Sequence, residues 1–163
     1  MNNVSPNQEK IYFGLDISQK TIEIFALKGE KGVSFGKIPN NQESLIEFFA
    51  QIPAKPETIT VALETGTHSA WISRQLEARG YEVIVAHARD LAFIYKGDKK
   101  SDRIDAEKLA RMARADKKLL HPVKVIDKKR QEDLLAIKAR DLLVKHRTGI
   151  INTIRGLVRS IGI

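Results

Sequence analysis

The chain has 163 residues and no cysteine, which excludes a disulfide framework and zinc sites built on thiolates. Its formal net charge of +8 is unevenly distributed, because residues 1–95 hold 9 Lys and Arg against 11 Asp and Glu, whereas residues 96–163 hold 19 against 9. No apolar run approaches the roughly 20 residues that span a bilayer, and residues 1–10 lack the apolar core of a signal peptide. We therefore expect a cytoplasmic protein without membrane contact. Its basic second part either binds a polyanion or is a solvated helix surface.

The first part of the chain predicts three strands joined by short turns. Residues 11–17 are apolar at nearly every position, which is typical of a central strand, and residues 20–27 and 33–38 are rich in β-branched and aromatic side chains. Short turns between successive strands indicate an antiparallel meander. These residues therefore predict one side of a β-sheet.

Helices and strands alternate in the next part. We expect a helix over residues 41–52, a strand over 59–63, a helix over 68–79 and a strand over 82–86, followed by a short helix over 88–96. Such alternation predicts parallel strands joined by helical crossovers. The two parts together predict a mixed α/β sheet flanked by helices.

An acidic helix follows. Ser101 and Asp102 are both residues that cap a helix N-terminus, and residues 106–113 are strong helix formers. Asp102 and Asp105 are three apart, so their carboxylates share one helix face. Taken alone, this pair is better explained by an acidic first turn that complements the helix dipole.

The composition of the sequence and the spacing of its apolar residues change beyond Pro122. Residues 128–161 contain no proline, and apolar side chains recur there at steps of three or four, which predicts one long amphipathic helix of roughly 50 Å. Gly149 and Gly156 are candidate positions for a kink or a break. We expect a domain over residues 1–122 and a basic helical, coiled-coil connector over 123–163 whose apolar seam packs against a second copy or a further domain. The seam residues assigned to dimerisation are Leu135, Leu142, Ile150, Ile154 and Leu157.

Four acids predict a metal site. Asp16 closes the apolar run of residues 11–15, and Glu64 closes that of residues 59–63. Carboxylates at the ends of apolar strands are poor core residues and good ligands for hard divalent ions. With Asp102 and Asp105 they form a candidate catalytic and metal-binding set for Mg²⁺ or Mn²⁺. Two such ions about 3.5–4 Å apart would suit in-line phosphoryl transfer.

Basic side chains surround the acidic pair in the sequence, as the phosphate backbone of a nucleic acid would require. For Arg111 and Arg114 a local ion pair, such as Arg111 with Glu107, is the alternative. The residues assigned to nucleic-acid binding are Lys96, Lys99, Lys100, Arg103, Arg111 and Arg114.

These motifs carry a resemblance to a known family. Gly14-Leu15-Asp16-Ile17-Ser18, Glu64-Thr65-Gly66 and the stretch from Lys100 to Ala106 resemble the acidic tetrad of DEDD-type transposases of bacterial insertion sequences, a family that includes Piv-type invertases. One small departure is Ser101, where the family pattern has threonine.

The resemblance implies a ribonuclease H-like (RuvC-like) domain of a DNA transposase or site-specific recombinase. It further implies a homodimer or higher oligomer that binds element ends, target DNA and a guide RNA. It also implies a second domain with a nucleophilic serine, which we do not find before Ile163, so we expect an N-terminal piece of such an enzyme.

Two other functions are compatible with parts of the pattern. The residues around Asp16 also resemble the first phosphate loop of sugar kinases and related ATPases, but the paired aspartates would then go unexplained. A non-catalytic module that binds nucleic acid and dimerises would need the basic helix alone. Dependence on the four carboxylates separates this module from an enzyme.

Overall fold

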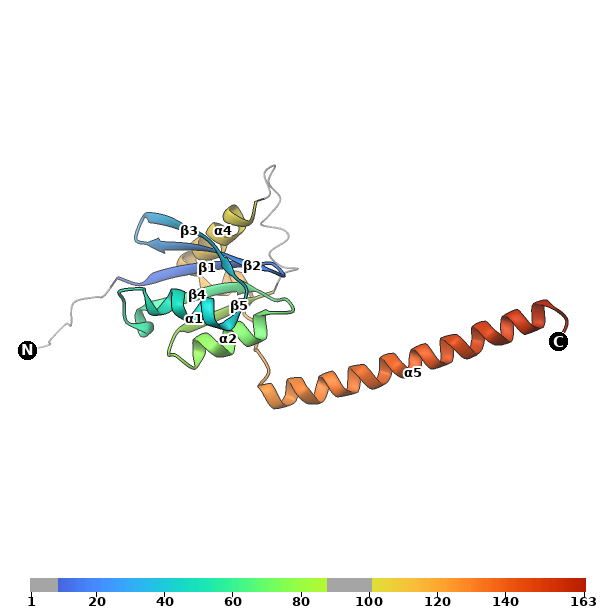
Figure 1. Cartoon of the computed structure of the whole chain (residues 1–163). Coiled ribbons are helices and arrows are strands. Elements are labelled where there is room, and N and C mark those ends of the chain that lie inside the picture. Colours follow the sequence, from blue (N-terminus) through green and yellow to red (C-terminus); the bar gives the residue numbers. More distant parts are fainter. Residues whose placement is uncertain (1–8, 88–100) are drawn as a thin grey trace, which may run out of the picture. The chain divides into compact units, whose positions relative to one another are not determined.

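A computed structural model of the chain describes residues 9–87 and 101–163. Its contacts divide the chain into two compact units, Met1–Val125 and Ile126–Ile163. The predicted helix over residues 88–96 lies outside the described residues. Figure 1 shows the helices and strands of both units.

The first unit is built on a five-stranded sheet. Three strands come from the expected meander, and β4 and β5 follow later in the chain, giving the order β3-β2-β1-β4-β5. The pairs β1–β2 and β2–β3 are antiparallel, whereas β1–β4 and β4–β5 are parallel. The strands are β1 (Ile11–Ile17), β2 (Thr21–Lys28), β3 (Lys31–Pro39), β4 (Ile59–Glu64) and β5 (Glu82–Ala86). This mixed arrangement with flanking helices is a ribonuclease H-like fold, and it confirms the predicted fold class.

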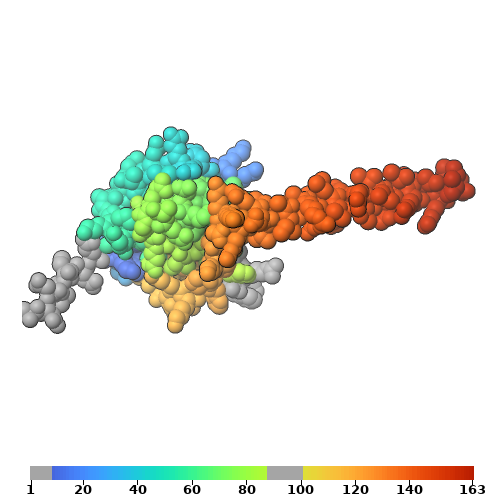
Figure 2. All heavy atoms as spheres, turned by 90° about the horizontal axis from the view of Figure 1, so that it is seen from below, coloured from blue at the N-terminus to red at the C-terminus, as the bar shows by residue number. Residues whose placement is uncertain are grey.

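Helices cover both faces of the sheet (Figure 1). On one face, α1 (Gln42–Ala50) and α2 (Ser69–Glu77) pack against the odd-numbered residues of β1, including Phe13 and Leu15. Figure 2 shows the atoms of α1 and α2 side by side on this face. Asn41 caps α1, because its side chain accepts a hydrogen bond from the Ser44 amide at 2.9 Å.

The opposite face carries α4 (Asp102–Ala115), which begins within a residue of where the capping signals predict. Small residues line its contact with the sheet, among them Ala106 and Ala110, which pack against Phe25 and Leu27 of β2. Short 3₁₀ turns at Pro56–Thr58 (η1) and Lys117–Leu120 (η2) complete the unit.

Gly14 sets the distance between α4 and the sheet. A Cβ atom built on Gly14 would lie 1.9 Å from the carbonyl oxygen of Ala106 and 2.8 Å from the amide nitrogen of Ala110. The helix and β1 therefore meet backbone to backbone, and any side chain at this position would push them apart.

A β-bulge interrupts the pairing of β2 with β3. Ile24 pairs with Gly36 and Phe25 pairs with Ser34, so Phe35 is the extra residue, and Gly36 has a φ of 76°. As a result Ser34 and Lys37, which are three apart, lie on the same face of the sheet.

The second unit is one helix, α5 (Lys128–Ser160), of 33 residues. Its N-terminus is capped by Asp127, whose side chain accepts a hydrogen bond from the Arg130 amide at 2.9 Å. Gly149 and Gly156 lie inside the helix and do not end it, so the long helix predicted over residues 128–161 is observed. Its seam residues Leu135, Leu142, Ile150, Ile154 and Leu157 are exposed by 55–64%.

Candidate active site

Pairing of β1 with β4 makes Asp16 and Glu64 neighbours. Leu15 lies opposite Leu63 in the parallel register, so the residues that follow, Asp16 and Glu64, lie side by side near the ends of β1 and β4. Adjacent strands are about 4.8 Å apart. Both carboxylates face α4, because the residues two positions earlier, Gly14 and Ala62, contact or pack with that helix.

The other two acids lie on the first turn of α4. Ser101 caps this helix, and its hydroxyl accepts a hydrogen bond from the Ile104 amide at 3.3 Å. The Asp105 side chain is 17% exposed and lies 3.9 Å from the Lys108 ammonium, whereas the Asp102 side chain is 51% exposed. The predicted spacing therefore brings one half-exposed and one mostly buried carboxylate to the same end of the helix.

The electrostatics of Asp16 link all four acids. The pKa of the Asp16 carboxyl is raised from 3.8 to about 6, first by burial and then by the negative charges of Asp102, Asp105 and Glu64, while the Lys37 ammonium opposes these causes. The structure therefore brings the other three sequence-predicted acids within electrostatic reach of Asp16.

We tested whether these residues fit a metal ion. Four carboxylates that repel one another are the donor set that Mg²⁺ or Mn²⁺ prefers, so the chemistry of the residues fits such an ion. Within residues 9–87 and 101–163, no group of three or more His, Cys, Asp or Glu side chains is already close enough to hold one. The four acids therefore provide the kind of oxygen ligands that such an ion prefers, but in this structure their side chains are not gathered closely around one point.

A hollow of about 520 Å³ adjoins two of the acids. Asp16 and Glu64 form part of its wall, and most of the other lining residues are polar and come from the segments that follow β1 and β4. These polar residues are Ser18, Gln19, Thr65, Thr67, His68 and Ser69.

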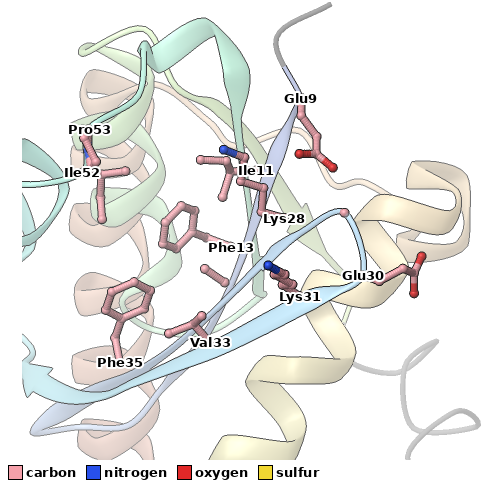
Figure 3. A pocket seen from close by; sticks show the side chains of 12 residues that line it. Glu9, Ile11, Phe13, Lys28, Glu30, Lys31, Val33, Phe35, Ile52 and Pro53 are labelled. Carbon is pink, nitrogen blue, oxygen red and sulfur yellow. The ribbon is translucent and has the colours of Figure 1, made fainter.

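A second hollow, of about 670 Å³, lies on the opposite face of the sheet (Figure 3). Phe13, Val33, Phe35 and Ile52 line it, so its wall is mainly apolar. The phenylalanine rings stack with centroids 6.2 Å apart. None of the four acids lines this hollow.

Two further charged residues, Glu23 and Lys37, lie on the same face of the sheet as Asp16 and were not predicted from the sequence. Glu23 lies opposite Asp16 in the β1–β2 register and is only 7% exposed, and Lys37 lies opposite Glu23 on β3. The Lys37 ammonium donates a hydrogen bond of 2.6 Å to Oδ2 of Asp102. A charged residue inside the apolar stretch Ile22-Glu23-Ile24 was the available signal.

Only part of the predicted phosphate-binding set is described. Lys96, Lys99 and Lys100 lie outside the described residues. Arg103 is exposed near the start of α4, and Arg111 donates to Glu107 at 2.8 Å, the local pair given above as the alternative. Arg114 donates to the carbonyl of Gly29 and pairs with Glu30 at 2.9 Å.

The sheet order and the carboxylates on its two central strands define a protein of the ribonuclease H-like class. A family model described as a transposase, of the DEDD type and the IS110 group, matches residues 13–163, and the chain belongs to this family.

A protein of Sinorhizobium fredii named "Putative transposase y4pF/y4sB" is 29% identical over 164 aligned positions. The match covers all of this chain but spans 40% of the length of that relative.

Across the two described ranges of the chain, we find no helix that is both long and apolar enough to cross a membrane.

Proposed function

We propose that this chain is the metal-dependent strand-processing part of a DNA transposase, with Asp16, Glu64, Asp102 and Asp105 as its catalytic and metal-binding residues. The observation that carries the proposal is the placement of the acids, because Asp16 and Glu64 lie on adjacent parallel strands and face α4, whose first turn holds Asp102 and Asp105. Family membership supports the same reaction class.

The four acids would hold Mg²⁺ or Mn²⁺, and two ions would fit the phosphoryl displacement that such ions promote. When bound, the metal supplies a Lewis acid beside the scissile phosphate. The chain contributes position, because the β1–β4 register holds Asp16 and Glu64 together and α4 brings Asp102 and Asp105. The polar hollow beside Asp16 and Glu64 is the proposed seat of the scissile strand.

Among the described residues, the two serines that line this hollow are poor candidates for the serine nucleophile that the resemblance implies. The Ser18 hydroxyl donates to the Thr21 carbonyl at 2.9 Å, and the Ser69 hydroxyl donates to the Gly66 carbonyl at 2.8 Å. Both hydroxyls are therefore hydrogen-bonded to nearby backbone carbonyls. We therefore propose that strand exchange requires a serine from a further domain.

The remaining partners follow from charge and from the exposed seam. We propose that residues 96–163, with 19 Lys and Arg against 9 Asp and Glu, bind element ends, target DNA and a guide RNA. We also propose that the α5 seam joins two copies, since its apolar side chains are more than half exposed.

The test is binding of Mn²⁺ to the whole chain and to the variant Asp16→Asn. A metal that binds the folded state raises the melting temperature by mass action, so the wild-type protein should show a rise that Asp16→Asn largely loses. Glu47→Gln, which removes an exposed carboxylate of α1, is the matched control and should keep the rise.

An equal rise in wild type and Asp16→Asn would place the ion elsewhere and contradict the proposal. DNA binding separates the enzyme from a non-catalytic module. If amide replacements of all four acids left both metal response and DNA affinity unchanged, the binding module would be the better explanation.

A further inference from the structure

A lysine lies among the acids of the candidate site. The Lys37 ammonium is 2.6 Å from Oδ2 of Asp102, although the two residues are 65 positions apart in sequence. The contact joins β3 to the first turn of α4, two elements that pack against each other. One of the four carboxylates proposed to bind metal, that of Asp102, thus already forms an ion pair with a lysine.

A second carboxylate lies within reach of the same lysine. Glu23 and Lys37 are direct partners across β2 and β3, and side chains of such pairs project from the same face with Cβ atoms about 5 Å apart. That face is the one covered by α4, because Phe25, two residues after Glu23, packs against Ala106.

We propose that Lys37 is a built-in counter-ion that competes with a divalent metal for Asp102, and that Glu23 receives the lysine ammonium when the metal binds. This inference rests on the proposed function, since it assumes that the metal binds at Asp102.

Burial explains why Glu23 would accept the lysine. Its side chain is 7% exposed, and the Ser34 hydroxyl donates only a long hydrogen bond of 3.5 Å to it. Burying an ionised carboxylate costs free energy unless an opposite charge pairs with it. An ammonium group that moves towards Glu23 would therefore form an ion pair in an environment of low dielectric constant. The bulge at Phe35 is what puts Ser34 and Lys37 on the same side as Glu23.

Exposure explains why Lys37 would leave Asp102. The side chains of Lys37 and Asp102 are 50% and 51% exposed, and an ion pair so accessible to water contributes little to stability. A divalent ion at Asp102 attracts the carboxylate more strongly than an ammonium does and repels the ammonium. Exchange therefore needs only a rotation of one long, flexible side chain.

The first experiment measures the affinity of the whole chain for Mn²⁺ by titration, with free Mn²⁺ followed by electron paramagnetic resonance. Lys37→Gln should bind Mn²⁺ about three- to tenfold more tightly, which is the order expected when one screened unit charge near a divalent ion is removed. Lys31→Gln is the matched control. It removes the same charge from the other end of β3, about 20 Å away, and should leave the affinity unchanged.

The second experiment tests the role of Glu23. Glu23→Gln should weaken Mn²⁺ binding more strongly when Lys37 is present than when it is combined with Lys37→Gln, where only the loss of the Glu23 charge itself remains. Because a variant at a buried position can fail to fold, the wild-type protein labelled with ¹³C on lysine gives an independent readout. The Lys37 Cε resonance should shift when diamagnetic Mg²⁺ is added, whereas that of Lys31 should not.

The outcomes separate the two proposals. If Mn²⁺ binding to wild type is absent or insensitive to Asp16→Asn, the proposed function fails. If wild type binds Mn²⁺ through Asp16 but Lys37→Gln binds it equally or more weakly, competition by Lys37 is refuted. A Lys37 resonance that Mg²⁺ leaves unmoved, or a Glu23→Gln effect that is equally large with and without Lys37, refutes the transfer to Glu23.

Discussion

Asp16→Asn should stabilise the metal-free protein at neutral pH. The pKa of Asp16 rises from 3.8 in a free carboxyl to about 6 in the folded chain, so the folded state binds this proton more tightly than the unfolded state does. The resulting penalty on folding is absent below about pH 4, grows between pH 4 and 6, and is complete above pH 6. Asparagine has nearly the same shape and carries no charge, so it removes the penalty.

The size of the effect follows from the same shift. At about 1.4 kcal/mol per pKa unit, a rise from 3.8 to about 6 corresponds to about 3 kcal/mol for a group shielded from solvent. Asp16 is only half-buried, and water screens part of this energy. We therefore expect Asp16→Asn to raise the free energy of unfolding by about 1–2 kcal/mol at neutral pH and by close to zero near pH 4.

The assay is urea unfolding followed by circular dichroism, in buffer containing EDTA, at several pH values between about 4 and 7.5. Glu47→Gln, on the exposed surface of α1, serves as the control and should change the free energy of unfolding little at any of them. A variant Asp16→Asn that is less stable than wild type at neutral pH, or a difference that does not vary with pH, would refute this account of the acidic site.

Three further predictions concern other parts of the chain. Gly14→Ala should lower the free energy of unfolding by about 1–3 kcal/mol, measured in urea, and weaken Mn²⁺ binding, because the added Cβ must push α4 away from the sheet. An unchanged affinity would show that the α4 acids are not needed. In sedimentation experiments, Leu142→Glu should abolish self-association. Thr148→Glu, on the other side of α5, should leave self-association intact, and equal effects of the two variants would contradict dimerisation through the seam. DNA affinity should fall about one decade per decade of salt for each phosphate contacted, whereas a salt-independent affinity would contradict the polyanion prediction.

The sheet and two of the acids could be predicted because local signals and topology agree. The apolar runs that end at Asp16 and Glu64 are too continuous for a surface strand, and the alternating helices required parallel pairing of their strands. Two parallel central strands must end on the same edge, so the two acids had to meet. The capping signals at Ser101 likewise fixed where α4 begins.

The pairing of Glu23 with Lys37 could not be predicted because it depends on a register that only tertiary structure sets. Without the bulge at Phe35, Ser34 and Lys37 would project from opposite faces of β3. One extra residue in a strand is invisible to a pattern of alternating hydrophobicity. The seam of α5 was predictable for the opposite reason, since helical spacing is a local property.

The contact between Gly14 and α4 restricts how this protein can change by mutation. Most tightly packed positions can be altered in two directions, because a large side chain can shrink and leave a cavity or be exchanged for another of similar volume. Glycine has no side chain to shorten, so every substitution at position 14 adds atoms against the backbone of Ala106 and Ala110. Compensation would have to move a whole helix and its two carboxylates with it. Position 14 should therefore be among the least tolerant in a saturation-mutagenesis screen, although it carries no chemistry of its own.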